Sequence, residues 1–237
     1  MLPAMRAKAN PRAADWRRRL TAWYRRAARD LPWRRTRDPW AIVVSEFMLQ
    51  QTQVSRVLDY YPRFLERYPS PHALARARPS AVREAWDGLG YYRRAANLQA
   101  LARVVVNEHG GRLPDEVAVL EQLPGVGKYT AGAVACFAYE KAAATVDTNV
   151  GRVLKRVFHG RVTKVTRVTK VTKVRGETTR LIELAESLQP RAGKAAWTFN
   201  QALMELGALV CTARNPKCGI CPVRRDCGWA AKQPKGG

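Results

Sequence analysis

The sequence predicts an all-α protein, and three observations support this fold class. Along several long segments, apolar side chains recur every three or four residues, which is the spacing of one helix face. Few segments alternate between apolar and polar residues, and no Asn-Gly hairpin signal occurs. Hydrophobic residues make up 46% of the 237 residues, which is enough for a packed core, and a chain of this length forms one large or two small domains.

The predicted helices follow a basic N-terminus. Residues 1–13 carry no regular apolar pattern, and we expect them to be flexible. Over residues 14–30, apolar side chains at helical spacing lie opposite arginines, which predicts an amphipathic helix that ends near Pro32. The helical pattern resumes over residues 40–61. Shorter helical segments follow, separated by prolines and glycines.

One segment departs from the helical pattern. Residues 161–175 repeat the triplet Arg/Lys-Val-Thr. A period of three scatters the valines around a helix and places them on both faces of a strand, so neither element gains an apolar face. We interpret this tract as a low-complexity basic insert in a surface loop.

The charge of the chain indicates a polyanionic partner. Lys and Arg number 42 and Asp and Glu number 19, which gives a formal net charge of +23 and a pI near 10.7. Such a charge attracts nucleic acid, with an anionic membrane surface as the rival interpretation. No apolar run approaches the roughly 18 residues of a membrane span, and the N-terminus lacks the apolar core of a secretory signal. We therefore expect a cytoplasmic DNA-binding protein, associated with the nucleoid in a bacterium.

Four of the five cysteines lie near the C-terminus with the spacing C-x6-C-x2-C-x5-C, at Cys211, Cys218, Cys221 and Cys227. Without an export signal, four clustered thiols indicate a metal site rather than disulfides. Thiolates select zinc or an iron–sulfur cluster, and the spacing alone does not decide between them. The fifth cysteine, Cys136, lies in an apolar helical run and is interpreted as a core residue.

A turn that contains two glycines separates two helical stretches within residues 117–139. The turn consists of Gly125, Val126, Gly127 and Lys128. The glycines allow close approach of a ligand, and the helix that follows offers unpaired N–H groups and the positive end of its dipole. We interpret the segment as a helix–hairpin–helix that binds a DNA phosphate through main-chain amides, although an ordinary helical corner fits the same pattern.

Two acidic residues stand out in a chain that is poor in acids. Glu46 lies inside an apolar helical stretch, where its carboxyl is either solvent-exposed or buried and suited to donate a proton. Asp147 precedes a further predicted helix, where the pattern favours a helix N-cap. From the residues alone, catalysis is one of two alternatives for each carboxyl.

Several longer motifs occur together in one order. They are Leu-Pro-Trp-Arg at 31–34, Val-Ser-Glu-Phe-Met-Leu-Gln-Gln-Thr-Gln-Val at 44–54, Gly-Leu-Gly-Tyr-Tyr at 88–92, the hairpin at 125–127, Val-Asp-Thr-Asn at 146–149 and Phe-Asn-Gln-Ala-Leu-Met-Glu-Leu-Gly at 199–207. Through them the chain closely resembles the MutY-type adenine DNA glycosylases of the endonuclease III (helix–hairpin–helix) superfamily. In that family the C-terminal cysteine spacing is the signature of a 4Fe–4S cluster.

The resemblance implies roles for individual residues. Glu46 would be the general acid that protonates adenine. Asp147 would stabilise the oxocarbenium-like sugar electrostatically or by transient covalent attack, and Asn149 would help to hold this arrangement. Tyr129 matches the position at which bifunctional relatives carry a Schiff-base lysine, which implies a monofunctional enzyme. The remaining matched residues would contact the DNA, in the base stack (Gln51 and Tyr91) or in the adenine pocket (Trp33, Arg34 and Leu49).

The resemblance also implies the domain organisation. A six-helix barrel over residues 41–145 and a cluster domain formed by residues 14–40 and 146–237 would flank a DNA cleft, and the target nucleotide would be flipped out of the duplex. The family's C-terminal NUDIX-like domain, which recognises 8-oxoguanine, has no counterpart here, because the sequence ends ten residues after Cys227. We therefore expect weaker selectivity for 8-oxoguanine.

The expected function is base excision repair by a monomer that hydrolyses the N-glycosidic bond of adenine mispaired with guanine or 8-oxoguanine in double-stranded DNA. Two alternatives are left. A mismatch thymine or uracil glycosylase of the same superfamily also lacks the extra domain and can carry a tyrosine at the position of Tyr129. A non-catalytic iron–sulfur protein that binds DNA would share the cysteines. Glu46 and the string Gln50-Gln51-Thr52 favour the adenine glycosylase.

Overall fold

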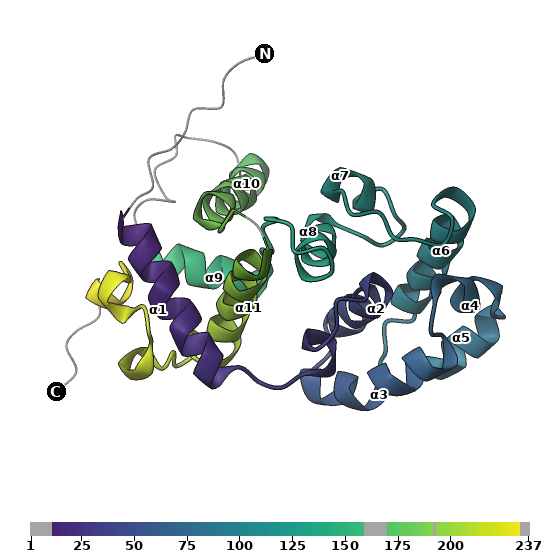
Figure 1. The fold of residues 1–237 in the computed structure, drawn as a ribbon. Coiled ribbons are helices and arrows are strands. Elements are labelled where there is room, and N and C mark those ends of the chain that lie inside the picture. The colour runs from purple at the N-terminus through teal and green to yellow at the C-terminus, as the bar shows by residue number, and fades with distance from the viewer. Residues whose placement is uncertain (1–10, 159–169, 192, 233–237) are drawn as a thin grey trace, which may run out of the picture. The chain divides into compact units, whose positions relative to one another are not determined.

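The computed structural model describes residues 11–158, 170–191 and 193–232, which Figure 1 shows as a ribbon. These residues form α-helices and short 3-10 turns and none of them lies in a strand, so the predicted all-α class is confirmed. The chain divides into a central unit, Asp30–Thr145, and a terminal unit that combines Met1–Arg29 with Val146–Gly237. The domain boundary expected after residue 40 therefore lies inside the central unit. No helix in the described ranges combines the length and the apolar composition that crossing a bilayer requires.

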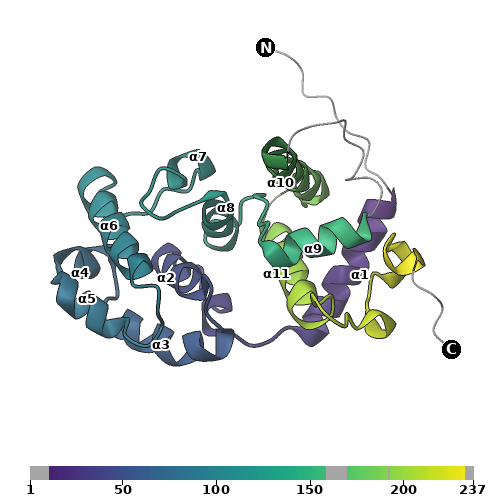
Figure 2. The same cartoon turned by 180° about the vertical axis from the view of Figure 1, so that it is seen from behind.

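In the central unit, helix α2 (Pro39–Leu49) is the most buried element. It packs against α3 (Val54–Arg67), α6 (Arg93–Glu108) and α8 (Lys128–Phe137), and Figure 2 shows these helices from behind. Because neighbours contact it on several sides, α2 is apolar around most of its circumference and buries every residue from Trp40 to Met48. The 3-10 turn η1 (Pro32–Arg34) and the short helices α4 (Pro71–Arg76), α5 (Pro79–Ala85) and α7 (Val117–Leu120) complete the unit.

The helical pattern of residues 40–61 is divided between α2 and α3 by a turn at residues 50–53. Gln51 in this turn has a left-handed backbone with a φ of 55°. The carbonyl oxygens of Phe47 and Met48, at the end of α2, accept hydrogen bonds from the Arg94 side chain. A contact from a distant helix thus satisfies the last turn of α2, and the local sequence gives no sign of it because the turn contains neither glycine nor proline.

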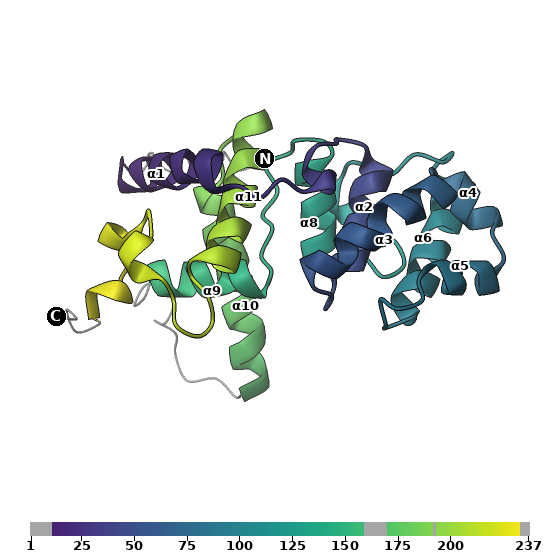
Figure 3. The ribbon, with the colours of Figure 1, turned by 90° about the horizontal axis from the view of Figure 1, so that it is seen from below.

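In the terminal unit, the residues that the structure describes form four helices and a C-terminal series of 3-10 turns. The helices are α1 (Pro11–Ala27), α9 (Thr148–Val157), α10 (Lys170–Leu188) and α11 (Gly193–Leu209). Helix α11 packs against both α1 and α9, and Figure 3 shows this arrangement from below. The 3-10 turns are η2 (Cys218–Ile220), η3 (Arg224–Asp226) and η4 (Ala230–Lys232).

Aromatic packing and one buried ion pair join α1 to the rest of the terminal unit. The Trp16 ring is 2% exposed, and its centroid lies 5.7 Å from those of Phe158 and Phe199, both in edge-to-face geometry. At the other end of α1, the fully buried carboxylate of Glu205 accepts hydrogen bonds from the backbone amide and the guanidinium of Arg29. A buried carboxylate needs such partners, so Glu205 fixes where the chain leaves α1.

Two expectations for basic segments need correction. Residues 11–13 are not flexible but form the start of α1, since a proline in the first turn of a helix gives up no hydrogen bond. Residues 170–175 of the Val-Thr tract do not belong to a loop but begin α10, because each residue added to a packed helix gains a hydrogen bond at little entropic cost. The rest of the N-terminal segment, residues 1–10, and the rest of the Val-Thr tract, residues 161–169, lie outside the described residues.

Candidate active site and cysteine pocket

Glu46 is a buried residue of the central unit. It lies in the second half of α2 and is 4% exposed, between the equally buried Ser45 and Phe47. The solvent-exposed alternative is therefore wrong, because packing on several sides of α2 encloses this position as well. A carboxyl enclosed in this way is suited to donate a proton.

Asp147 is the N-cap of α9 in the terminal unit, as the pattern predicts. Its Oδ1 accepts a hydrogen bond of 2.6 Å from the amide of Val150. Its Oδ2 accepts one of 3.2 Å from the side-chain amide of Asn149. Each carboxylate oxygen thus accepts one hydrogen bond, and the side chain is half-buried at the start of the helix.

Asn149 is itself held by a residue that sequence reasoning did not single out. The Nη2 of Arg152 donates to Asn149 Oδ1 at 2.8 Å and to the carbonyl of Gly207 at 2.7 Å. The Nε of the same guanidinium donates to the carbonyl of Cys211 at 2.7 Å. Hydrogen bonds therefore lead from Asp147 through Asn149 and Arg152 to the backbone of the first of the clustered cysteines. In a chain with 42 Lys and Arg residues, no sequence signal marks this arginine.

The glycine turn joins α7 to α8. Gly125 has a φ of 75°, and a Cβ there would lie 2.8 Å from Asn97 Cβ and 3.0 Å from the Phe47 ring, so both backbone conformation and packing require glycine. Gly127 is the N-cap of α8 and, having no side chain, makes no capping hydrogen bond. A Cβ at this position would meet no atom within 4 Å, so the space beside it is open. Val126 differs from the rest of the turn, since its side chain is 8% exposed and its amide donates to the carbonyl of Leu123. Lys128 is exposed.

Gln51 and Tyr91 share an uncommon conformation. Their φ angles are 55° and 48°, in the left-handed region that non-glycine residues seldom adopt, and both side chains are exposed. Tyr91 is 65% exposed, which is high for a large aromatic side chain. The two residues lie in separate loops, and the side chain of Arg94 donates hydrogen bonds to both loops. Arg94 is the second functional arginine, after Arg152, that no sequence pattern distinguishes from the other arginines.

The residues matched to an adenine pocket are only partly accessible. Trp33 is 8% exposed and packs edge-to-face on Tyr61, with 5.5 Å between the ring centroids. Arg34, Leu49 and Tyr129 are of intermediate exposure. Together with Glu46 they belong to the central unit, whereas Asp147 and Asn149 belong to the terminal unit.

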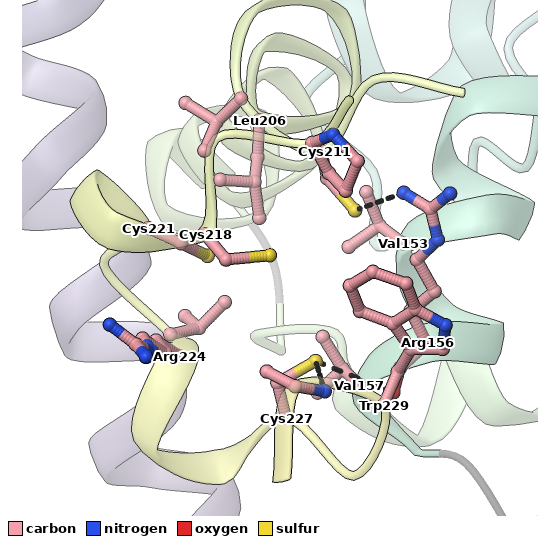
Figure 4. Close-up of a pocket in the computed structure, with 14 residues that line it drawn as sticks. Val153, Arg156, Val157, Leu206, Cys211, Cys218, Cys221, Arg224, Cys227 and Trp229 are labelled. Carbon is pink, nitrogen blue, oxygen red and sulfur yellow. Dashed lines mark hydrogen bonds between the residues drawn. The ribbon is translucent and has the colours of Figure 1, made fainter. Parts of the chain in front are cut away.

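The four C-terminal cysteines line one pocket of the terminal unit. Figure 4 shows their sulfur atoms around this space, beside the apolar side chains of Val153, Val157 and Leu206. Among the described residues, no three His, Cys, Asp or Glu side chains converge closely enough to bind a single metal ion. Four thiols around one space are a ligand set that either a zinc ion or an iron–sulfur cluster uses.

The surroundings of the pocket suit a buried cluster. Burial raises the pKa of Cys221 to about 11 and raises the pKa of Cys227, so these thiols need a bound cation to be held as thiolates. Arg156 Nη1 lies 3.4 Å from Cys211 Sγ (Figure 4), and the same guanidinium stacks on the Trp229 ring at 4.9 Å. The backbone amide of Ala230 donates to Cys227 Sγ. A positive side chain and N–H donors next to sulfur stabilise negative charge there.

Comparison with known proteins supports this description. The model of the HhH-GPD superfamily base excision DNA repair protein matches residues 44–174, and that of the iron-sulfur binding domain of endonuclease III matches residues 211–227. The cofactor is therefore an iron–sulfur cluster of the 4Fe–4S type, and the zinc alternative is excluded.

Three relatives illustrate the similarity. An adenine DNA glycosylase of Mycobacterium tuberculosis is 47% identical over 211 residues, which cover 89% of this chain and 66% of that protein. A thymine-DNA glycosylase of Aeropyrum pernix is 39% identical over 213 residues, which cover 89% of this chain and 92% of that protein. The solved structure of a thermostable thymine-DNA glycosylase superposes with a TM-score of 0.82 at 35% identity, covering 93% of this chain and 97% of that one. The chain thus spans just under two thirds of the mycobacterial relative and nearly all of the Aeropyrum relative.

Proposed function

Since this chain belongs to the HhH-GPD superfamily of base excision DNA repair proteins, we propose that it hydrolyses the N-glycosidic bond of adenine mispaired with guanine or 8-oxoguanine in double-stranded DNA. The observation that carries the proposal is the buried carboxyl of Glu46 in a chain that is 47% identical to an adenine DNA glycosylase. A proton donor shielded from water can serve the departing base, which is a poor leaving group as an anion.

We assign different tasks to the two carboxyls. Glu46 donates a proton to the adenine ring, and Asp147, held in place by its cap hydrogen bonds, stabilises the positive charge that develops on the sugar. Asn149 fixes the second oxygen of Asp147. Water completes the hydrolysis. Tyr129 cannot form an imine as a lysine does, so the enzyme is proposed to be monofunctional.

The remaining residues are proposed to bind the DNA. Main-chain amides at the start of α8 and the exposed Lys128 bind a phosphate, next to the open face of Gly127. Gln51 and Tyr91 enter the base stack when the target nucleotide leaves it, and Trp33, Arg34 and Leu49 contact the flipped adenine. Val126 contributes to the turn by packing, because its side chain is buried and its amide is already bonded.

Cys211, Cys218, Cys221 and Cys227 are the proposed ligands of the iron–sulfur cluster. When bound, the cluster supplies cross-links between turns that have few buried side chains of their own. It thereby holds Cys211, whose carbonyl is bonded to Arg152.

A second candidate function is the removal of thymine or uracil mispaired with guanine. It is favoured by one observation, the similarity to thymine-DNA glycosylases over nearly their whole length. The higher identity to the adenine glycosylase is the reason to rank this candidate second.

A single-turnover assay with duplexes that contain A·8-oxoG, A·G, T·G or U·G separates the candidates. We expect release of adenine from the first two duplexes and no strand cleavage without added alkali, with a duplex of matched A·T pairs as the control. Release of thymine or uracil without adenine would establish the second candidate. The control for a contaminating enzyme is the Asp147→Asn, Glu46→Gln double variant. This variant should release no base, so any base that its preparation releases comes from another enzyme.

A further inference from the structure

Arg94 is a buried arginine at the start of α6 in the central unit, and its side chain is bonded to two loops. It is 8% exposed. Its Nη1 lies 2.9 Å, 2.8 Å and 2.5 Å from the carbonyl oxygens of Phe47, Met48 and Gln50. Its Nη2 lies 3.0 Å from Thr52 Oγ1 and 3.0 Å and 3.1 Å from the carbonyl oxygens of Leu89 and Gly90. Residues 47–52 and residues 89–90 are thus bonded to one guanidinium.

The burial of the charged Arg94 side chain is not explained by a gain in folding stability. All six acceptors are neutral oxygen atoms, and no acidic group neutralises Arg94 within the described residues. The buried Nε has no hydrogen-bond partner there, and burial lowers the pKa of Arg94. A buried cation without a counter-ion is costly, and an apolar side chain of similar volume would avoid that cost.

Two of the acceptor carbonyls lie next to residues with an unusual backbone conformation. The carbonyls of Gln50 and Gly90 immediately precede Gln51 and Tyr91, the two left-handed residues with exposed side chains. A bond to the carbonyl of the preceding residue fixes the peptide plane from which each side chain departs. The guanidinium carbon also lies 5.7 Å from the centroid of the Tyr91 ring. Each left-handed conformation is unfavourable for a residue that carries a side chain, so a bond that favours it has a measurable effect.

We infer that Arg94 is a positioning residue, which sets the directions in which Gln51 and Tyr91 project from their loops and so prepares both side chains for insertion into DNA. The inference rests on the proposed function in one respect, namely that these two side chains enter the base stack. Arg94 itself contacts neither base nor phosphate in this role. Pre-positioned side chains avoid the entropic cost of ordering two loops when the duplex binds.

The test replaces Arg94 by lysine, which keeps the charge but offers one compact donor in place of a planar fork and cannot reach both loops. A duplex with 2-aminopurine next to the mispaired adenine reports unstacking through its fluorescence. In Arg94→Lys we expect the fluorescence increase on binding and the single-turnover rate to fall about 10- to 100-fold. Affinity for undamaged duplex should change by less than about threefold, because no phosphate contact is lost. The control is Arg103→Lys on the same helix, an exposed arginine with one long bond to the carbonyl of Ala75.

A double-mutant cycle separates positioning from a general effect on stability. If Arg94 acts through Gln51 and Tyr91, Arg94→Lys should cause no further loss in a Gln51→Ala, Tyr91→Ala background. An equal loss in both backgrounds, or no loss in the wild-type background, would overturn the inference. Wild-type protein that unstacks the duplex but releases no base would contradict the proposed function alone, since the fluorescence still reports insertion.

A milder substitution serves if Arg94→Lys does not fold. Thr52→Val removes one of the six acceptors, whereas Thr52→Ser retains the hydroxyl. We expect a reduced fluorescence increase with valine and not with serine. Equal signals from the two variants would also overturn the inference.

Discussion

Glu46 and Asp147 are held in different ways, which suits the different tasks proposed for them. Glu46 is enclosed by packing in the middle of a helix. Asp147 lies at the first residue before a helix, is half-buried, and accepts a hydrogen bond from the amide of Val150. A proton donor and a stabilising anion require such opposite surroundings.

The first prediction concerns these two carboxyls. Glu46→Gln removes the proton donor and should lower the single-turnover rate by about 10²- to 10⁴-fold. Asp147→Asn should lower it to a similar extent while leaving thermal stability nearly unchanged, because asparagine is as good an N-cap as aspartate. The matched control is Asp38→Asn, since Asp38 caps α2 through a 3.0 Å bond from Trp40. A loss of activity in the control equal to that in Asp147→Asn would show that capping, not charge at the sugar, is what matters.

The sequence indicated those functional residues whose chemical type is uncommon in this chain or typical of one kind of site. Four cysteines at metal-ligand spacing and two carboxyls in a chain with few acids stand out from their surroundings. Arg94 and Arg152 do not, because they act on backbone carbonyls that are distant along the chain. One arginine cannot be told from another until the loops that it contacts are placed.

At the scale of elements, periodicity identified the helices but not all of their ends. It placed α1 and α9 correctly in kind because each buries an apolar face. It missed the end of α2 at Leu49, which depends on side-chain bonds from α6. It also missed that the last part of the Val-Thr tract belongs to α10, since a packed helix extends into residues that have no apolar face of their own.

The contact between α9 and α11 depends on one glycine. A Cβ at Gly207 would lie 2.8 Å from Asn149 Cβ and 3.1 Å from the Asn149 carbonyl carbon and oxygen. These neighbours include backbone atoms that cannot turn aside. Gly207 therefore sets how closely α11 approaches the start of α9, where Asp147 is the cap.

The second prediction tests this contact. Gly207→Ala should destabilise the protein by about 1–3 kcal/mol through overpacking. It should also lower the single-turnover rate by about 10- to 100-fold, because displacement of Asn149 moves the Asp147 carboxylate. The control is Gly151→Ala on α9, where a Cβ meets Leu181 at an ordinary 3.7 Å. That control should keep its activity and melt at the same or a slightly higher temperature. Unchanged activity in Gly207→Ala would refute the proposed role of this contact.

At the scale of the whole molecule, the net charge of +23 governs association with DNA. We predict that affinity for duplex falls steeply with salt, by about 100-fold between about 50 and 200 mM salt for four neutralised phosphates. The single-turnover rate at saturating protein should change much less, since bound DNA has already lost its counterions. Fluorescence anisotropy and product assays measure the two quantities, and a salt-independent affinity would contradict electrostatic binding.

A pair of lysine variants refines this measurement. Lys128→Ala should reduce the slope of log affinity against log salt by about one, as loss of one phosphate contact does. Lys155→Ala should leave the slope unchanged, because its ammonium is paired with Glu177 at 2.9 Å. Equal slopes for the two variants would remove Lys128 from the phosphate site.

The terminal unit combines both ends of the sequence, which has a consequence during translation. The central unit is continuous, so its helices can fold as soon as residue 145 has left the ribosome. Helix α1 is translated before the central unit but packs against α11, whose last residue is Leu209. At about 5–20 residues per second, the apolar face around Trp16 waits roughly 10 to 40 s for its partner. During this interval the nascent chain exposes the apolar face of α1, which favours aggregation through this helix.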